Sequence, residues 1–434
     1  MSEPENVVPI TKAPNTGEIG ASGLLIGGGR VRDEFHRDLR DNRAVRIFRE
    51  MRDNDPIVGA LLFAIDMTLR EIDWHVAPSE DNNEAAQVEA DFVASCLGDM
   101  STTWPQFISA ALSLLPFGWS FFETVYKIRG GLSNDPARSS RYDDRRIGWR
   151  KQALRVQESL SHWEFDEAGG IQAFVQQTQQ GIVTIPIDKG LLFRTTTARG
   201  NPEGRSILRN AYRPWHFKKR IEEIEAIGTE RDLAGLPVAL VPPAYLANNA
   251  PDDMKQALEA IKVILRDIRA DAQTSVVFPK EVDPDTGQDL WELKLLSTGG
   301  RRQFDTDAII GRYNQLIAMT VMADFLLLGH ESVGSKALGV SKIELFTTAL
   351  TAYLDEVASV MNDYAIPRLM KLNGVNQALW PTLRHADVRQ PDLIEIGAYV
   401  KDIAGAGVIM DPVLEERLRE LGGLPSMDPE QQQL

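Results

Sequence analysis

Apolar residues recur at helical spacing in the first part of the chain. A helix is predicted to begin at Asp55-Pro56, because Asp is a good N-cap and Pro suits the first helical position. Two more helices are predicted over residues 84–97 and 104–115. Cys96 falls on the apolar side of the first of these, so we expect a small core residue there and not a nucleophile.

The pattern then changes to short strands. Residues 121–128 form the first predicted strand. Residues 161–165 and 171–177 flank the turn sequence Glu-Ala-Gly-Gly, which predicts a β-hairpin. Two further short strands are predicted over 182–187 and 191–195. Because helices cluster before strands, the first half of the chain is expected to have an α+β fold.

Two long helices are predicted to bracket a small α/β insert in the second half. The first covers about 206–230 and contains Pro214, which predicts a kink or a split. The second covers about 304–328. The insert between them is predicted to contain strands at 237–241, 275–278 and 291–295 and a helix at 252–268.

The segment GHESVGSKALG, residues 329–339, is predicted to be a loop. Ser341 and Glu344 after it form a capping-box pattern, which predicts the start of a third long helix. Pro367 is expected to bend or end that helix, and Asn373-Gly374 to close it. Two shorter helices are predicted near the C-terminus, at about 391–405 and 411–421, and residues 1–40 read as an extended or mobile arm.

Composition narrows the class of protein. No apolar run is long enough to cross a bilayer, and no signal peptide is recognisable at the N-terminus. A single cysteine cannot form an internal disulfide, which fits assembly in a reducing cytoplasm. The net charge of −15 argues against a DNA-binding protein that uses a basic patch. It is compatible with a wall along which DNA slides, and equally with simple solubility.

No catalytic or metal-binding pattern emerges from the sequence. The six histidines are scattered, and no GxSxG motif is present, so no metal and no cofactor are predicted. The loop resembles a P-loop at Gly334-Ser335-Lys336, but Lys and Ser stand in the wrong order and the loop follows a helix. Nucleotide binding is therefore rejected there. The loop is either a plain helix connection or a flexible segment whose phosphate-compatible donors are His330, Ser332, Ser335 and Lys336.

Basic residues cluster at several other places, which offer possible contacts to DNA or to another subunit. Most runs of this kind are solvated faces or interface ion pairs, and only a minority contact nucleic acid. The clusters considered are Lys218, Lys219 and Arg220; Arg301 and Arg302; and Arg141, Arg145, Arg146, Arg150 and Lys151.

Several stretches in this order resemble the portal (head–tail connector) family of tailed phages, and within it the Mu-like branch. They are RDNDPIVGALLFAID with WHVAP, LPFGWSFFETVY, SHWEFDEAGGI, NPEGRSILRNAYRPWHFKKRIEEIEAIGTER and LLLGHESVGSKAL. The resemblance implies an α+β portal fold. Its implied parts are an arm (1–40), a wing (41–200), stem helices (201–235 and 301–328), a clip (236–300), a tunnel loop (329–340), a long wing helix (341–374) and a short crown with a tail (375–434).

The resemblance also implies a function without chemistry. Twelve subunits would form a ring at one capsid vertex of the virion, through which the genome is packaged and ejected. The implied partners are further copies of the chain, double-stranded DNA bound without sequence preference, the major capsid protein, the terminase large subunit and a head–tail adaptor. Two alternatives remain open, a nucleotide-dependent packaging or DNA-processing enzyme and a non-viral oligomeric scaffold.

Overall fold

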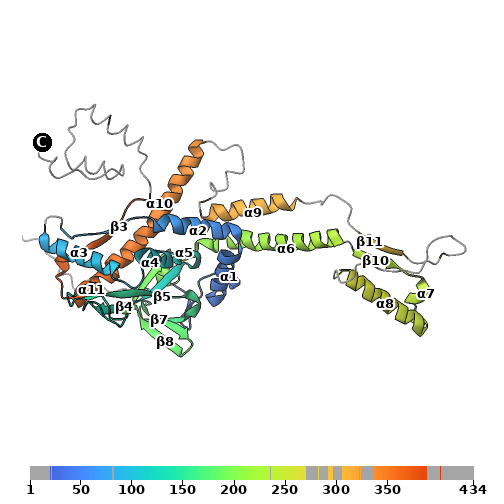
Figure 1. Cartoon of the computed structure of the whole chain (residues 1–434), viewed down its shortest axis with the longest axis horizontal. Coiled ribbons are helices and arrows are strands. Elements are labelled where there is room, and N and C mark those ends of the chain that lie inside the picture. The colour runs from blue at the N-terminus through green and yellow to red at the C-terminus, as the bar shows by residue number, and fades with distance from the viewer. Residues whose placement is uncertain are drawn as a thin grey trace, which may run out of the picture. The chain divides into compact units, whose positions relative to one another are not determined.

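The computed structural model describes residues 20, 22–80, 83–234, 236–269, 282, 292–296, 305–321, 323, 336–388 and 401 (Figure 1). Contacts divide the chain into two compact units. The larger unit comprises residues 1–209 and 320–434, and the smaller unit is Asn210–Met319. The predicted C-terminal helices at 391–405 and 411–421 lie outside the described residues, apart from the helical Lys401.

The larger unit begins with helices whose ends follow the sequence signals. The Asp55 carboxylate accepts hydrogen bonds from the backbone N–H of Ile57 (2.9 Å) and of Val58 (3.1 Å), which confirms the predicted N-cap. The helix predicted over 104–115 is instead two helices with a break at Leu112-Ser113, and Gly118 ends the second one in a left-handed conformation. The helices are α1 (Asp41–Asn54), α2 (Pro56–Arg70), α3 (Glu84–Gly98), α4 (Trp104–Ala111) and α5 (Leu114–Phe117).

Two antiparallel three-stranded sheets follow, with strand orders β5-β4-β9 and β6-β7-β8. The predicted hairpin is confirmed as β6–β7. A separate strand, β3 (Trp74–Ala77), pairs with the distant β12 (Thr382–His385). The sheet strands are β4 (Trp119–Ile128), β5 (Ile147–Arg155), β6 (Leu160–Phe165), β7 (Ile171–Thr178), β8 (Gly181–Pro186) and β9 (Gly190–Arg194).

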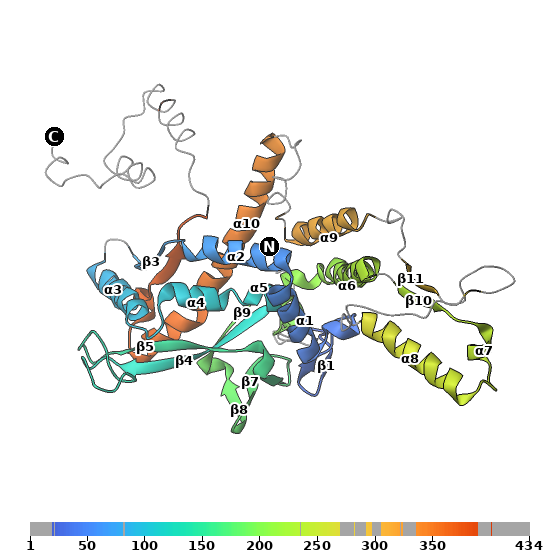
Figure 2. The same cartoon turned by 45° about the vertical axis from the view of Figure 1, so that its right-hand side comes forward.

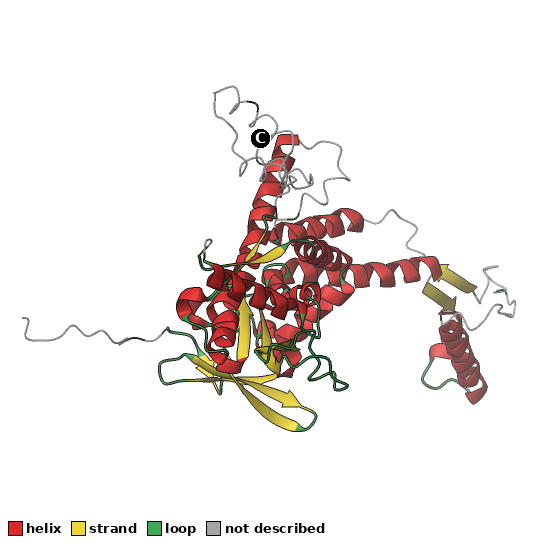
Figure 3. Cartoon of the chain, turned by 60° about the vertical axis from the view of Figure 1, so that its left-hand side comes forward, coloured by secondary structure: helices red, strands yellow, loops and turns green. Residues whose placement is uncertain are grey.

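The strand β4 joins the two cores of the larger unit, because neighbouring side chains of a strand point to opposite faces. Phe121 stacks on Phe174 of the second sheet, with ring centroids 4.6 Å apart. Phe122 packs instead among the helices, 5.1 Å from Phe107. Gly190 of β9 is paired with Glu123, and a Cβ added to it would stand 2.2 Å from the Phe121 ring. The sheets lie on one side of this unit and α2, α3, α4 and α10 on the other (Figures 2 and 3).

The helix α10 (Lys336–Val360) crosses this helical layer and contributes four buried residues to the core. It begins earlier than predicted, so Ser341 lies inside it and the expected capping box is wrong. Ala337 and Leu338 are strong helix formers, and the one Gly costs only about 1 kcal/mol. A π-helical turn (Met361–Ala365) leads into α11 (Ile366–Leu372), which starts beside Pro367 and ends at Asn373-Gly374 as predicted.

The N-terminal segment departs from the predicted arm. Residues 22–40 contain the short strands β1 (Ile26–Gly27) and β2 (Arg30–Val31) and a 3-10 turn. The Trp163 backbone N–H donates to the Gly29 carbonyl (2.8 Å), and the Arg209 guanidinium donates two hydrogen bonds to the Glu34 carboxylate (2.6 and 2.7 Å). An extended arm is therefore the wrong description of these residues, because backbone pairing and a buttressing ion pair attach them to the larger unit.

In the smaller unit, the helices α6 and α9 are connected by an insert that contains two paired strands and two further helices. The helix predicted over 206–230 is split before Pro214 into a 3-10 turn (Ile207–Arg209) and α6, as one of the two predicted alternatives had it. Pro214 then lies in the first turn of α6, where it is tolerated, and it causes no kink. The second helix, α9, ends earlier than predicted, and the predicted strand at 275–278 lies outside the described residues. The elements are α6 (Tyr212–Ala234), β10 (Leu236–Leu240), α7 (Pro243–Leu246), α8 (Asp252–Arg269), β11 (Glu292–Leu296) and α9 (Thr306–Thr320).

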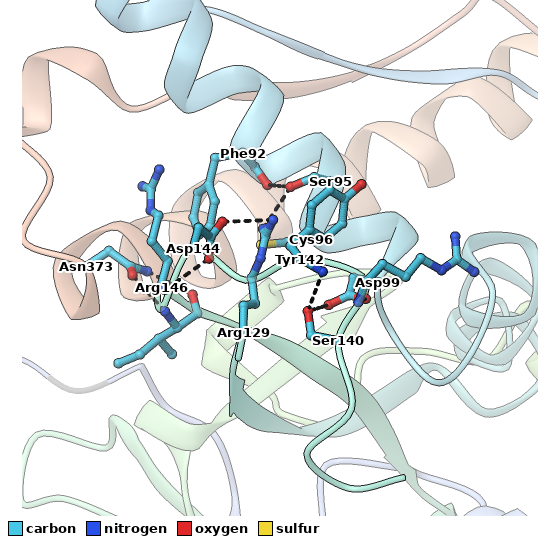
Figure 4. A network of polar contacts seen from close by, with 12 residues as sticks. Phe92, Ser95, Cys96, Asp99, Arg129, Ser140, Tyr142, Asp144, Arg146 and Asn373 are labelled. Carbon is cyan, nitrogen blue, oxygen red and sulfur yellow. Dashed lines mark hydrogen bonds and ion pairs between the residues drawn. The ribbon is translucent and has the colours of Figure 1, made fainter. Parts of the chain in front are cut away.

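Buried charges fix the long loop between β4 and β5 (Figure 4). The Lys127 ammonium lies 2.9 Å from the Asp99 carboxylate, and both side chains are almost fully buried. The same carboxylate accepts hydrogen bonds from the Ser140 hydroxyl (2.6 Å) and the Arg141 backbone N–H (3.0 Å). Burial acts to raise the pKa of Asp99, but these hydrogen bonds and the Lys127 charge outweigh it and lower the pKa.

A second buried cation anchors the other end of this loop. The Arg129 guanidinium lies between the rings of Phe92 and Tyr142, 5.0 and 4.1 Å from their centroids. It also pairs with the Asp144 carboxylate (3.0 Å) and donates to the Cys96 sulfur (3.2 Å). Cys96 is fully buried, and burial raises its pKa, so the predicted core role is confirmed.

We predict that Asp99→Asn lowers the free energy of unfolding by about 3 kcal/mol, because it leaves Lys127 buried without a counter-charge. Urea unfolding at pH 7 measures the change. Asp143→Asn removes an exposed ion pair with Arg145 in the same loop and should change stability by less than about 1 kcal/mol. Equal effects of the two substitutions would contradict the anchoring role.

Candidate functional site

Most of the residues predicted to face DNA lie outside the described structure. His330, Ser332 and Ser335 belong to this group, as do Arg301 and Arg302. Lys336 is the first residue of α10, so the last four residues of the predicted loop at 329–339 are helical. The predicted loop therefore extends too far at its C-terminal end. Its basic residue stands at a helix start.

The other predicted cluster lies near the start of α6, and its charges are locally engaged. Lys218 is only 2% exposed and its ammonium lies 3.9 Å from the Glu222 carboxylate. The Lys219 ammonium lies over the Trp215 ring, 5.5 Å from its centroid. Arg220 is exposed but pairs with Glu223 at 3.3 Å. The three residues therefore do not form one free basic patch. Their local partners favour an ordinary solvated or ion-paired face over a contact to nucleic acid.

The smaller unit instead exposes apolar residues along its two long helices. Within it, α6 and α9 meet through stacked rings of Phe217 and Tyr313 (6.5 Å) and a hydrogen bond from the Thr306 hydroxyl to Glu225. Phe217 remains 44% exposed despite this contact. Further exposed apolar residues are Ile224 and Ile227 on α6 and Leu316 and Met319 on α9.

The chain enters the smaller unit through a tight crossing of two glycines in the larger one. Gly118 and Gly204 both have positive φ. A Cβ on Gly204 would stand 2.2 Å from the Gly118 carbonyl oxygen, and one on Gly118 would stand 2.5 Å from the Glu203 carbonyl oxygen. The Thr195 hydroxyl bonds the Arg205 backbone on the same segment, at 2.6 and 2.9 Å. The segment 201–206 is thus locked just before Asn210, where the smaller unit begins.

Glu203 places a carboxyl group in this crossing. Its side chain is partly buried and accepts one long hydrogen bond from the Trp163 indole N–H (3.3 Å). The pKa of Glu203 is raised to about 7, chiefly by burial and in smaller part by the nearby Asp41 carboxylate, against the lowering effects of the Trp163 hydrogen bond and of Arg30. An adjoining cavity of about 470 Å³ is lined by both apolar and charged residues, among them Phe48, Trp119 and Arg209.

The described residues hold no arrangement with obvious chemistry. No group of three or more His, Cys, Asp or Glu side chains in this part of the chain is arranged to hold a metal ion. No helix among the described residues has both the length and the apolar character needed to span a membrane. The features that remain are the locked entry to the smaller unit and its exposed apolar helices.

Comparison with solved structures shows the fold. A chain of the virion of a native gene transfer agent particle aligns with a TM-score of 0.53 and 13% identity, covering 94% of this chain and 97% of that chain. A chain of the neck of an empty gene transfer agent particle, computed with C6 symmetry, gives 0.52 and 12%, with 91% and 95% covered. One from the neck of a native particle, computed with C12 symmetry, gives 0.50 and 12%, with 94% and 97% covered.

Comparison with protein families shows what class of protein this is. The family described as the portal protein of Mu bacteriophage matches residues 45–424. The chain therefore belongs to the family of Mu-type portal proteins, which confirms the resemblance found in the sequence. A comparison with curated proteins gives no match.

We predict that Glu203 makes the larger unit less stable as the pH rises. Because the folded-state pKa lies above that of the unfolded chain, the folded state binds the proton more tightly between about pH 4.5 and 7. Stability should therefore fall through this window, by at most about 3 kcal/mol. Glu203→Gln should remove this slope and raise the free energy of unfolding at pH 8, measured in urea.

Glu167→Gln, in the exposed β6–β7 turn, serves as the control and should keep the wild-type slope. An unchanged slope in Glu203→Gln would show that the carboxyl group is solvated in the folded protein.

Proposed function

We propose that this chain is a portal subunit, twelve copies of which form a ring around a central channel for double-stranded DNA. Membership of the portal family over residues 45–424 carries the proposal. Genome packaging and ejection through the ring would need no chemistry from the subunit, and no cofactor.

Exposed apolar side chains support a ring of copies. Four large apolar residues on α6 and α9 are exposed and take no part in the ring contact between these helices, and Ile224 among them is 56% exposed. Exposed apolar surface of this kind marks sites of protein association. The neck of the native gene transfer agent particle, which contains a chain of the same fold, was computed with C12 symmetry. That symmetry favours a dodecamer here also.

The net charge suits passage of DNA. Twelve copies at −15 each carry 12 × −15 = −180 formal charges. At physiological salt the screening length is about 8 Å, so repulsion of phosphates acts only where the wall comes close. A mostly acidic wall with isolated basic side chains touches DNA without holding it.

Within the ring we assign roles to the parts of the chain. Residues 201–235 and 301–328 would form the stem, 236–300 the clip, 41–200 and 341–374 the wing, and 375–434 the crown and tail. The clip would bind the terminase large subunit during packaging and the head–tail adaptor afterwards. The wing would contact the major capsid protein at the portal vertex of the virion. The tunnel loop, 329–340, would approach the DNA.

The direct test is electron microscopy of the purified full chain. Rings with an open central channel are expected, and monomers or filaments at micromolar concentration would contradict the proposal. Ile224→Asp should shift the population from rings to free subunits while circular dichroism stays unchanged, because a charge would be buried in the contact. Leu246→Asp, at an exposed apolar position on the short helix α7, is the matched control and should keep the rings.

A second prediction concerns the loop charge. Lys336→Glu should leave ring formation intact but reduce genome packaging and retention, because the substitution places a carboxylate where phosphates pass. Packaged DNA per particle is measured by nuclease protection. Arg138→Glu, an equal charge reversal at a highly exposed residue in the loop between β4 and β5, should package normally. Full packaging by Lys336→Glu would refute the tunnel-loop assignment.

A further inference from the structure

The helix α2 differs from its neighbours in being apolar on both sides. Its inner face places Val58, Leu61, Ile65 and Leu69 in contact with the larger unit, where all four are buried. Its outer face carries Ala60, Phe63 and Met67, at spacings of three and four residues that put them on one side of a helix. Phe63 is 66% exposed and Met67 is 41% exposed.

Charge is almost absent from this helix. Its two charged residues are Asp66 and Arg70, and they pair with each other at 3.3 Å. The adjacent α1 is different, because it buries Val45, Phe48 and Met51 and carries charged residues around the rest of its surface. A helix that is apolar all round is normally covered on all sides. The outer face of α2 is therefore a surface that another protein segment should cover.

The chemistry of this face selects the kind of partner. DNA phosphates need cations or hydrogen-bond donors, and Ala60, Phe63 and Met67 supply neither. Phenylalanine and methionine are instead enriched in the centres of protein–protein interfaces. In the neck assemblies that share this fold, symmetry-related copies surround one axis, and the alignment covers at least 91% of this chain. A second copy of the chain is thus a partner that every such ring supplies.

We propose that the outer face of α2, formed by Ala60, Phe63 and Met67, packs against the neighbouring copy in the ring. The inference rests on the proposed ring and adds a contact to it. The exposed parts of Phe63 and Met67 come to roughly 200 Å², taking about 200 Å² for each whole side chain. A stable interface needs about 800 Å² on each partner, so the outer face of α2 supplies only part of it.

The contact is necessarily between two different surfaces. In a closed ring of more than two copies, each interface joins one face of a subunit to another face of the next. The outer face of α2 therefore meets a surface other than α2 itself. A cross-link from α2 should reach a different element in the neighbouring chain.

A photo-reactive benzoylphenylalanine at position 63 tests this with little change in shape. After irradiation of purified rings, covalently linked dimers and higher multimers should appear on a denaturing gel. Mass spectrometry should place the second attachment outside α2. The same probe at Leu132, which is 87% exposed in the loop between β4 and β5, is the control and should give at least tenfold fewer links.

A solution measurement complements the cross-link. Phe63→Glu should raise the concentration at which half of the rings dissociate by about tenfold or more, as expected when one interface anchor is lost. Leu132→Glu should leave it unchanged, and circular dichroism checks the fold of each variant.

The outcomes separate the inference from the proposed function. Links confined within one chain, or none, in a protein that forms rings would overturn the α2 contact and leave the ring standing, since other parts of the same chain would then cover Phe63. Absence of rings in the wild-type protein would overturn both.

Discussion

The close crossing of Gly118 and Gly204 is the constraint on which the arrangement of the larger unit depends. Two backbones approach so closely there that neither position has room for a Cβ, and both residues have positive φ. Gly118 ends α5 and starts β4, while Gly204 lies on the segment that leads to the smaller unit. The helix layer, the central strand and the exit of the chain therefore share one contact. Any side chain there would push these three elements apart.

The strand β4 begins at this crossing, forms the centre of one sheet and packs against the other. Phe121 and Phe122 are consecutive, yet one belongs to the aromatic cluster between the sheets and the other to the helical core. The loop that follows is held by buried ion pairs of Asp99 and Arg129, which restrict its conformation more than they add to stability.

The smaller unit and α2 show a different balance of forces. Their helices carry more apolar surface than their own unit can bury, since Ile224, Leu316 and Phe63 are all exposed. In a monomer such a surface would promote association. In a ring subunit it is the source of assembly free energy. A structural role thus explains both the excess apolar surface and the scattered, locally paired basic residues such as Lys218 and Arg220.

Local signals in the sequence determined much of the secondary structure. The N-cap at Asp55, the β6–β7 hairpin and the end of α11 at Asn373-Gly374 all depend on neighbouring residues only, so the pattern predicted them correctly. The family also followed from the sequence, because ordered stretches of residues carry it. The predicted helix start at Ser341 was wrong, because α10 begins at Lys336, where helix propensities outweigh the single capping pattern.

Only the tertiary structure decided which apolar faces are covered and which glycines are required by contact. Leu61 and Phe63 are both large apolar residues on opposite faces of α2, and only the fold shows that Leu61 is buried in the larger unit while Phe63 is exposed. Likewise nothing near Gly204 in the sequence indicates the Gly118 carbonyl that faces it. Residues 22–40 looked like an extended arm because their partners Trp163 and Arg209 are far away in the chain. Long-range contacts of this kind have no local signature in the sequence, and they determine how this subunit presents itself to its neighbours.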